Sequence, residues 1–205
     1  PLRHAEWHGW TLADTVFPFF LFIVGVSIAL SFGGRLEAGE DRKALYMKIV
    51  RRAIVLLALG LFLNAFPEFD LANLRIPGVL QRIAVCYLAA SIVFLNTSWK
   101  GQLAWAAGLL LAYWAAMEFI PFPGGSAGLY EKGNNLASWV DARLLAGHMW
   151  EQAKTWDPEG VLSTVPAVST VLLGVQAGNW LRRGSASRKK ATGLLAAGGA
   201  AGRVW

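Results

Sequence analysis

Two histidines, two tryptophans and an aspartate stand together near the start of the chain, in HAEWHGWTLAD, residues 4–14. The titratable members are His4, His8 and Asp14. A histidine accepts a proton at neutral pH because its ordinary pKa is about 6.5, so this stretch is suited to general base catalysis. The alternative is a structural role, in which Trp and His mark a membrane interface and Asp14 complements the dipole of a helix that begins there. The residue types alone leave both interpretations open.

Two arginines form a second candidate group. The stretch LRIPGVLQR holds Arg75 and Arg82, and Pro77 favours a helix that begins near it, which leaves Arg75 before the helix. An arginine within a membrane helix is costly and usually faces a wet cavity or the bundle interior. Two guanidinium groups near one helix end are suited to bind phosphate or carboxylate. The alternative is that both side chains snorkel to the membrane surface.

A third group is acidic. Asp157 and Glu159, in TWDPEG, precede another apolar run, and they are suited to cap a helix, to bind sugar hydroxyls or to orient a base. The histidines are few and irregularly spaced, and the single cysteine, Cys86, lies inside an apolar run. We therefore predict no metal site and no disulfide framework.

The elements that must position these residues are membrane helices. Of 205 residues, 55% are hydrophobic and only 16% are charged, against about 25% charged in soluble domains. Crossing a bilayer takes about 20 residues. The predicted fold is an all-α, polytopic transmembrane helix bundle with about five full spans plus a truncated sixth. The predicted spans are 15–34, 53–67 with a start near 47, 79–99, 101–121 and 160–181, and the sixth begins near 191.

Loop charges orient this bundle. Basic residues collect in segments 35–52 and 182–190, so both are predicted to be cytoplasmic, while 1–14 and 122–159 face outward. The same rule accounts for the net charge of +6, and no pattern suggests nucleic acid. We expect a multi-pass protein of a bacterial inner membrane, with residues 1–205 as a single partial domain.

The outer segment 122–159 is predicted to contain an amphipathic helix that lies on the membrane surface. Its apolar face is formed by residues at i, i+3, i+4 and i+8. These residues are Leu136, Trp139, Val140 and Leu144.

The pattern H-A-x-W-x-G-x-T-x-A-D-x-V-F-P-x-F-x-F-x-x-G, from His4 to Gly25, resembles the heparan-α-glucosaminide N-acetyltransferase family. The resemblance continues through LRIPGVLQRIAVCY and TWDPEGVLSTVPAVSTVLLGVQAG. It implies an acyltransferase bundle of more than ten membrane helices, of which this chain is a part truncated at both ends. The family acetylates the amino group of a terminal glucosamine on the outer or lumenal side, with acetyl-CoA supplied from the cytoplasm. The resemblance also implies a homodimer.

The family's essential histidine corresponds to His4. Acetyl transfer to an amine needs a deprotonated nucleophile and a stabilised oxyanion, so His4 is expected to remove the amine proton or to carry the acetyl group itself. Asp14 is expected to orient His4 or to hold the segment before the first helix in place. The other candidates are Arg82 and Arg75 for the CoA phosphates or the oxyanion, Trp7 for stacking on the sugar or on adenine, and Asp157 and Glu159 for the sugar.

A different class of function stays open beside the enzyme. A transporter or flippase that shares the fold would use Arg82 to carry an anionic sugar or lipid headgroup. Loss of acetyl transfer in a His4→Ala variant that still binds substrate would favour the enzyme.

Overall fold

The computed structural model describes residues 3–182 and 192–193, so most of the predicted sixth span and most of the basic segment 182–190 lie outside the described residues. The described part is mostly helical, as predicted, with one short two-stranded hairpin that the sequence analysis did not foresee. Its elements are α1 Leu12–Glu37, α2 Arg42–Ala65, α3 Val79–Asn96, α4 Trp99–Phe119, β1 Tyr130–Glu131, β2 Asn134–Asn135, α5 Leu136–Leu144 and α6 Val161–Arg182.

Local sequence signals explain where several helices begin. Thr11 is the N-cap of α1, and the carboxylate of Asp14 accepts the backbone N–H of Thr11 at 2.8 Å, as in a capping box. The α3 helix begins directly after the Pro77–Gly78 pair, so Arg75 lies before it, as predicted. The side chain of Asn135 accepts the N–H of Ser138 at 2.9 Å and caps α5.

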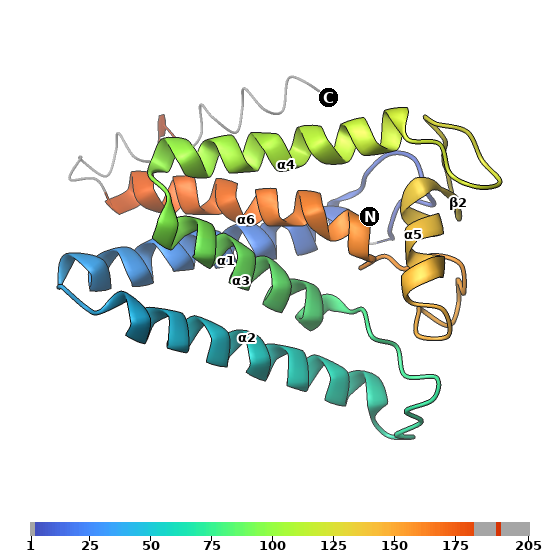
Figure 1. The fold of residues 1–205 in the computed structure, drawn as a ribbon, viewed down its shortest axis with the longest axis horizontal. Helices are drawn as coiled ribbons and strands as arrows, with labels where there is room; N and C mark the ends of the chain where they lie inside the picture. The colour runs from blue at the N-terminus through green and yellow to red at the C-terminus, as the bar shows by residue number, and fades with distance from the viewer. Residues whose placement is uncertain (1–2, 183–191, 194–205) are drawn as a thin grey trace.

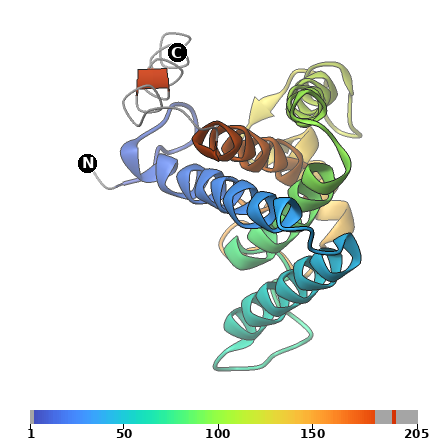
Figure 2. The same ribbon diagram turned by 90° about the vertical axis from the view of Figure 1, so that its left-hand side faces the viewer.

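The α6 helix occupies the centre of the bundle, where it contacts α1, α3 and α4 (Figure 1). The α2 helix packs on α3, on the side away from α4 (Figure 2). Glycines allow α1 and α6 to touch backbone to backbone. A Cβ added to Gly25 would lie 1.9 Å from the carbonyl oxygen of Val171, and one added to Gly174 would lie 2.0 Å from that of Phe22. Small residues at such crossings are typical of membrane helix pairs.

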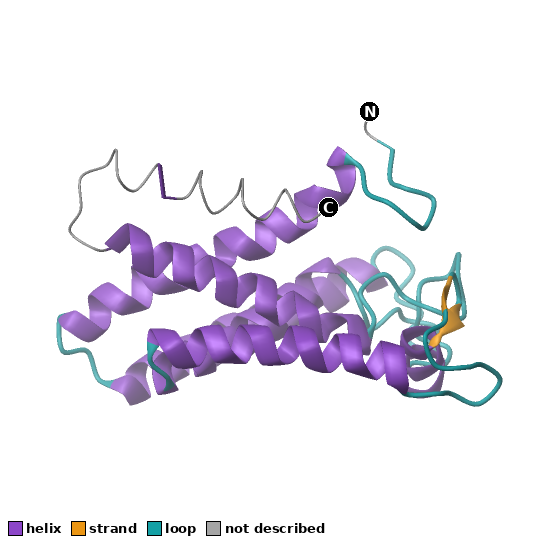
Figure 3. Ribbon diagram, turned by 90° about the horizontal axis from the view of Figure 1, so that it is seen from above, coloured by secondary structure: helices purple, strands orange, loops and turns teal. Residues whose placement is uncertain are grey.

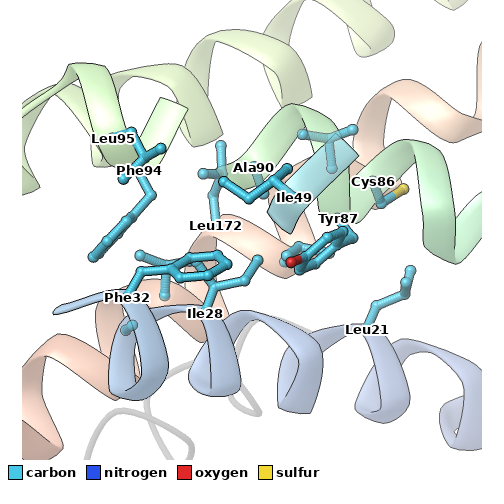
Figure 4. Close-up of a cluster of buried hydrophobic side chains, with 14 of the residues drawn as sticks. Leu21, Ile28, Phe32, Ile49, Cys86, Tyr87, Ala90, Phe94, Leu95 and Leu172 are labelled. Carbon is cyan, nitrogen blue, oxygen red and sulfur yellow. The ribbon is translucent and has the colours of Figure 1, made fainter. Parts of the chain in front are cut away.

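The hydrophobic core lies among α1, α2, α3, α4 and α6. Its buried side chains include Leu21, Ile28, Cys86, Tyr87 and Leu172, which point toward one another in Figure 4. The core fixes the positions of α1, α3 and α6 relative to one another. The α1 helix carries Asp14, α3 carries Arg82, and α6 follows the turn that holds the acidic candidates. The bundle is therefore the scaffold of the candidate site.

Three of the described helices, α1, α3 and α6, are long and apolar enough to cross a membrane by length and composition. The α2 and α4 helices are not among them, although they have 24 and 21 residues, so the predicted count of five full spans is not confirmed. The predicted start of this helix near 47 was wrong, because α2 already begins at Arg42. Hydropathy marks the apolar part of a helix, whereas Lys and Arg are good helix formers and continue it.

The elements that carry the candidate residues meet at one end of the bundle (Figure 3). The first turns of α1, α3 and α6 lie at this end, together with the last turns of α2 and α4. The N-terminal lip, residues 3–11, lies there with the segment 66–78 and the loops between 120 and 160. The lip and the loops between 120 and 160 thus lie at the same end of the bundle, in agreement with the predicted grouping of segments 1–14 and 122–159 on one side.

Candidate active site at one end of the bundle

His4 and Asp14 form a hydrogen-bonded pair at the start of α1. Nδ1 of His4 lies 2.6 Å from Oδ1 of Asp14, and the histidine side chain is 76% exposed. The other oxygen of Asp14 accepts the N–H groups of Ala5 at 3.2 Å and Thr11 at 2.8 Å. An ionised carboxylate only accepts, so Nδ1 of His4 donates and Nε2 is left free to take a proton. The pair has the arrangement of an oriented general base.

Trp7 joins the lip to the hairpin and to the loop before α6. Its Nε1–H donates to the backbone carbonyl of Tyr130, in β1, at 2.6 Å. Its ring meets that of Trp156 edge to face, with centroids 5.3 Å apart. Trp150 packs on the same Trp156 at 5.8 Å. The lip is thus held against both the hairpin and the loop that precedes α6.

A pocket of about 360 Å³ opens beside these aromatic residues. The lip, α4, the hairpin, α5 and the start of α6 all contribute to its wall. The lining residues are Trp7, His8, Tyr113, Met117, Tyr130, Asn135, Ala137, Ser138, Asp141, Trp156, Asp157, Pro158 and Ser163. His4 is outside this lining, although it shares the lip with Trp7 and His8.

Arg75 binds both predicted acidic residues. Its Nε and Nη2 donate to the two oxygens of Asp157 at 2.9 and 2.7 Å, and Nη2 also contacts Glu159 at 2.5 Å. Burial acts to lower the pKa of Arg75, but the hydrogen bond and charge of Asp157, followed by Glu159, outweigh it and raise the pKa. The Asp157 oxygens also accept the N–H groups of Trp150 and Glu159 at 2.9 Å. Arg75, from the segment before α3, therefore forms one cluster of three charges with Asp157 and Glu159, from the turn before α6.

Arg82 lies deeper, between α3, α1 and α6. Its Nη2 donates to the carbonyl of Gly160 at 3.3 Å and to the hydroxyl of Ser163, and its Cζ is 6.0 Å from the ring centroid of Phe17. Its Nε is buried without a hydrogen-bond partner among the described residues. A buried guanidinium with an unused donor is suited to meet a negative charge.

Sequence reasoning missed Asp141, the most deeply buried polar residue of α5 at 2% exposure. Its carboxylate accepts the N–H of Val161 at 2.9 Å and that of Asp157 at 3.4 Å. Asp141, rather than Asp157 or Glu159, therefore caps the first residue of α6. Burial raises the pKa of Asp141.

The buried side of α5 differs from its predicted apolar face. Leu136 is buried, and Trp139 and Val140 pack with it against Met117 and Phe122, whereas Leu144 is 66% exposed. The helical periodicity was correct, but an aspartate on the buried side was not anticipated. Tyr113, Tyr130 and Trp156 were missed as well, and the only signal for them was the aromatic content of segments beside the turn-rich stretch.

Comparison with known proteins gives consistent matches. A family model described as "Heparan-alpha-glucosaminide N-acetyltransferase, catalytic" matches residues 2–201. Two curated proteins named heparan-alpha-glucosaminide N-acetyltransferase, from Mus musculus and Homo sapiens, are each 32% identical over 231 aligned residues, which cover 87% of this chain. The chain spans about a third of the length of these relatives, 34% in each case.

Proposed function

Because the chain belongs to the heparan-α-glucosaminide N-acetyltransferase family, we propose that it is part of a membrane acyltransferase that moves an acetyl group from acetyl-CoA to the amino group of a glucosamine-type sugar or related glycan. The observation that carries the proposal is the 2.6 Å hydrogen bond between His4 and Asp14. It gives a solvent-exposed imidazole a fixed tautomer at the position where the family resemblance expects the essential histidine.

His4 supplies the proton chemistry in this proposal. Attack of an amine on a thioester requires the nitrogen to lose a proton, which Nε2 of His4 accepts while Asp14 stabilises the resulting imidazolium. In a second route, Nε2 attacks the thioester carbonyl, the CoA thiolate leaves, and the acetylated imidazole passes the acetyl group to the amine. Both routes use the same dyad.

Arg82 is proposed to meet negative charge on the donor, either a phosphate or the oxyanion that develops on the thioester carbonyl. Its unused Nε supports this role. Arg75 is different, because Asp157 and Glu159 already balance its charge. We therefore propose that Arg75, Asp157 and Glu159 position the turn before α6, and that Trp7 serves the sugar side.

The membrane arrangement is also part of the proposal. Helices α1 to α4 and α6 are proposed as five spans of one domain, with the lip and segment 122–159 outside and segments 35–52 and 182–190 in the cytoplasm. The ionic contacts of Glu40 with Arg35 and Lys48, and of Arg182 with Glu37, lie at the end opposite the lip and support this orientation. A bacterial inner membrane, acetyl-CoA supplied from the cytoplasm and a homodimer are further parts of this proposal.

The test measures transfer of a labelled acetyl group from acetyl-CoA to glucosamine by the full-length protein in detergent. His4→Ala is compared with wild type and with Glu6→Ala, an exposed lip residue that belongs to neither the dyad nor the pocket lining. Loss of a general base predicts a rate lowered by a factor of about 10² to 10⁴ in His4→Ala only. Undiminished transfer in His4→Ala would refute the role of the dyad. No transfer by wild type, together with uptake of an anionic sugar into vesicles, would favour a transporter.

The two chemical routes are separated without an acceptor. Labelled acetyl-CoA is mixed with protein alone, and the protein is freed of small molecules before counting. Label retained by wild type and absent from His4→Ala indicates the acetylated histidine, whereas no retained label indicates direct transfer.

A further inference from the structure

A single peptide group, between Gly160 and Val161, lies between an acidic and a basic side chain. The N–H of Val161 donates to Oδ1 of Asp141, on α5, at 2.9 Å. The carbonyl of Gly160 accepts Nη2 of Arg82, on α3, at 3.3 Å. The N–H and C=O of a trans peptide point in opposite directions, so the two side chains bind opposite edges of one planar group. Among the described residues, no hydrogen bond or ion pair joins Asp141 to Arg82 directly.

The orientation of Arg82 depends on this first turn of α6. Its Nη2 also donates to the hydroxyl of Ser163, which itself donates to the Gly160 carbonyl at 3.1 Å. A guanidinium is planar and rigid, so these bonds at Nη2 restrict the direction in which Nε points. Nε is the donor that is buried without a partner among the described residues. An anion that meets Nε is therefore met at a position that the first turn of α6 sets.

Asp141 in turn holds that first turn. The α5 helix packs beside the start of α6 (Figure 1), and Asp141 is 2% exposed. A Cβ added to Gly160 would lie 1.9 Å from Oδ2 of Asp141, so the carboxylate packs directly on the turn. Hydrogen bonds at both edges of a buried peptide polarise it and strengthen one another. Loss of the carboxylate would free the Val161 N–H and allow the Gly160 carbonyl to turn away from Arg82.

We propose that Asp141 is a positioning residue for Arg82 and acts on the acetyl donor through the Gly160–Val161 peptide group. The assignment rests on the proposed acetyltransferase function, in which Arg82 meets a phosphate or the thioester oxyanion of the donor. Asp141 also lines the pocket beside the lip, so the competing role is a direct contact with the acceptor amine. The two roles predict effects on different substrates.

The test measures kcat and both KM values for acetyl transfer by the full-length protein in detergent. Arg82→Gln first shows which parameter Arg82 controls, the KM for acetyl-CoA if it meets a phosphate or kcat if it meets the oxyanion. We expect Asp141→Ala to raise that KM or lower that kcat about tenfold, with the KM for glucosamine unchanged. Asp141→Asn should recover most of the change, because its amide oxygen still accepts the Val161 N–H. Asp70→Asn is the matched control, since Asp70 accepts the N–H of Ala72 at 3.0 Å but is exposed and lies outside the pocket lining.

A double variant tests whether Asp141 acts through Arg82. Asp141→Ala should add little in the Arg82→Gln background, because the group that it positions is already gone. Ser163→Ala removes the other partner of Arg82 and should change the same parameter, without the loss of stability that Asp141→Ala brings. Full additivity in the double variant, an effect of Asp141→Ala confined to the KM for glucosamine, or an Asp141→Asn variant as impaired as Asp141→Ala would overturn the assignment. So would an Arg82→Gln variant with unchanged kcat and unchanged KM for acetyl-CoA.

A separate measurement distinguishes failure of this assignment from failure of the proposed function. If wild type transfers no acetyl group, the proposed function fails. A double-mutant cycle on Tm, with Asp141→Ala and Arg82→Gln, then still decides whether the two residues share the peptide group. A measurable coupling supports the arrangement, and additive changes in Tm overturn it.

Discussion

Oδ1 of Asp141, on the short helix α5, accepts the backbone N–H of Val161, the first residue of the central helix α6, at 2.9 Å. The two residues are 20 positions apart, and Gly160 lies so close to the carboxylate that an added Cβ would be 1.9 Å from Oδ2. The contact joins the outer segment to the bundle at the point where the pocket and the cluster of Arg75 meet.

Replacement of this cap is expected to loosen the end of the bundle. Asp141→Ala removes acceptors for two N–H groups and should lower the free energy of unfolding by about 2 kcal/mol. The shift is measurable as a lower Tm in detergent. Glu151→Ala, at an exposed position, is the control, and an equal Tm in both variants would contradict the capping role.

Asp141 also predicts a dependence of stability on pH. Burial raises its pKa in the folded protein above the ordinary value of 3.8; the charge of Asp157 adds to this and that of Arg82 opposes it. The folded state therefore holds the proton more tightly, and this stabilisation is complete below pH 3.8 and is lost as pH rises through the raised pKa. Asp141→Asn does not titrate, so its Tm minus that of wild type should increase as pH rises across this range. A constant difference would contradict the prediction.

The backbone contact between α1 and α6 predicts intolerance of a single methyl group. Gly174→Ala places a Cβ against the carbonyl of Phe22 and should cost about 1 to 3 kcal/mol. Gly108→Ala, in α4, meets no atom within 4 Å and is expected to be neutral or slightly stabilising. Thermal melting and the monodisperse fraction in size-exclusion chromatography compare the two, and a harmless Gly174→Ala would mean that the helices separate easily.

The cluster of Arg75 predicts a coupled pair of substitutions. Arg75→Met leaves the buried carboxylate of Asp157 without its cation and should destabilise the fold by about 3 kcal/mol. Adding Asp157→Asn should restore part of that loss, which a double-mutant cycle on Tm would show. If Arg75→Met instead raised the KM for acetyl-CoA without a change in Tm, Arg75 would be a donor contact as the sequence first suggested.

Asp14→Asn tests how the dyad works. An amide in place of the carboxylate no longer fixes the tautomer of His4, so kcat should fall by a factor of about 10² to 10⁴ with little change in the KM for glucosamine. The double variant with His4→Ala should be no slower than His4→Ala alone, because the two residues act as a unit. A further loss in the double variant would show that Asp14 acts independently of His4.

The sequence predicted a helix well where an apolar run extends over most of its length. Runs 15–34 and 160–181 correspond to Leu12–Glu37 and Val161–Arg182, and Pro77 correctly indicated the start of α3. The start of α2 was missed because a helix continues through basic residues beyond its apolar part, where hydropathy falls.

The contacts of the site were less accessible to prediction. The motif around His4 and Asp14 is local, so a single sequence suggests that the two residues cooperate. Arg75 and Asp157 are 82 positions apart, and nothing in their types distinguishes an ion pair with each other from a bond to a ligand. Periodicity shows which face of α5 is apolar, but it does not show that Asp141 on the buried side holds another helix.

The central helix is also the last long helix of the described chain, and this has a consequence for biosynthesis. The ribosome synthesises α1 through α4 well before residue 161. The close approach of Gly25 to Val171 and the hydrogen bonds of Arg82 to Ser163 and to the Gly160 carbonyl therefore form late. During that interval the guanidinium of Arg82 lacks its hydrogen-bond partners, the hydroxyl of Ser163 and the carbonyl of Gly160. The packing of α1, α3 and α4 around α6 can therefore be completed only after residues 161–182 have been synthesised.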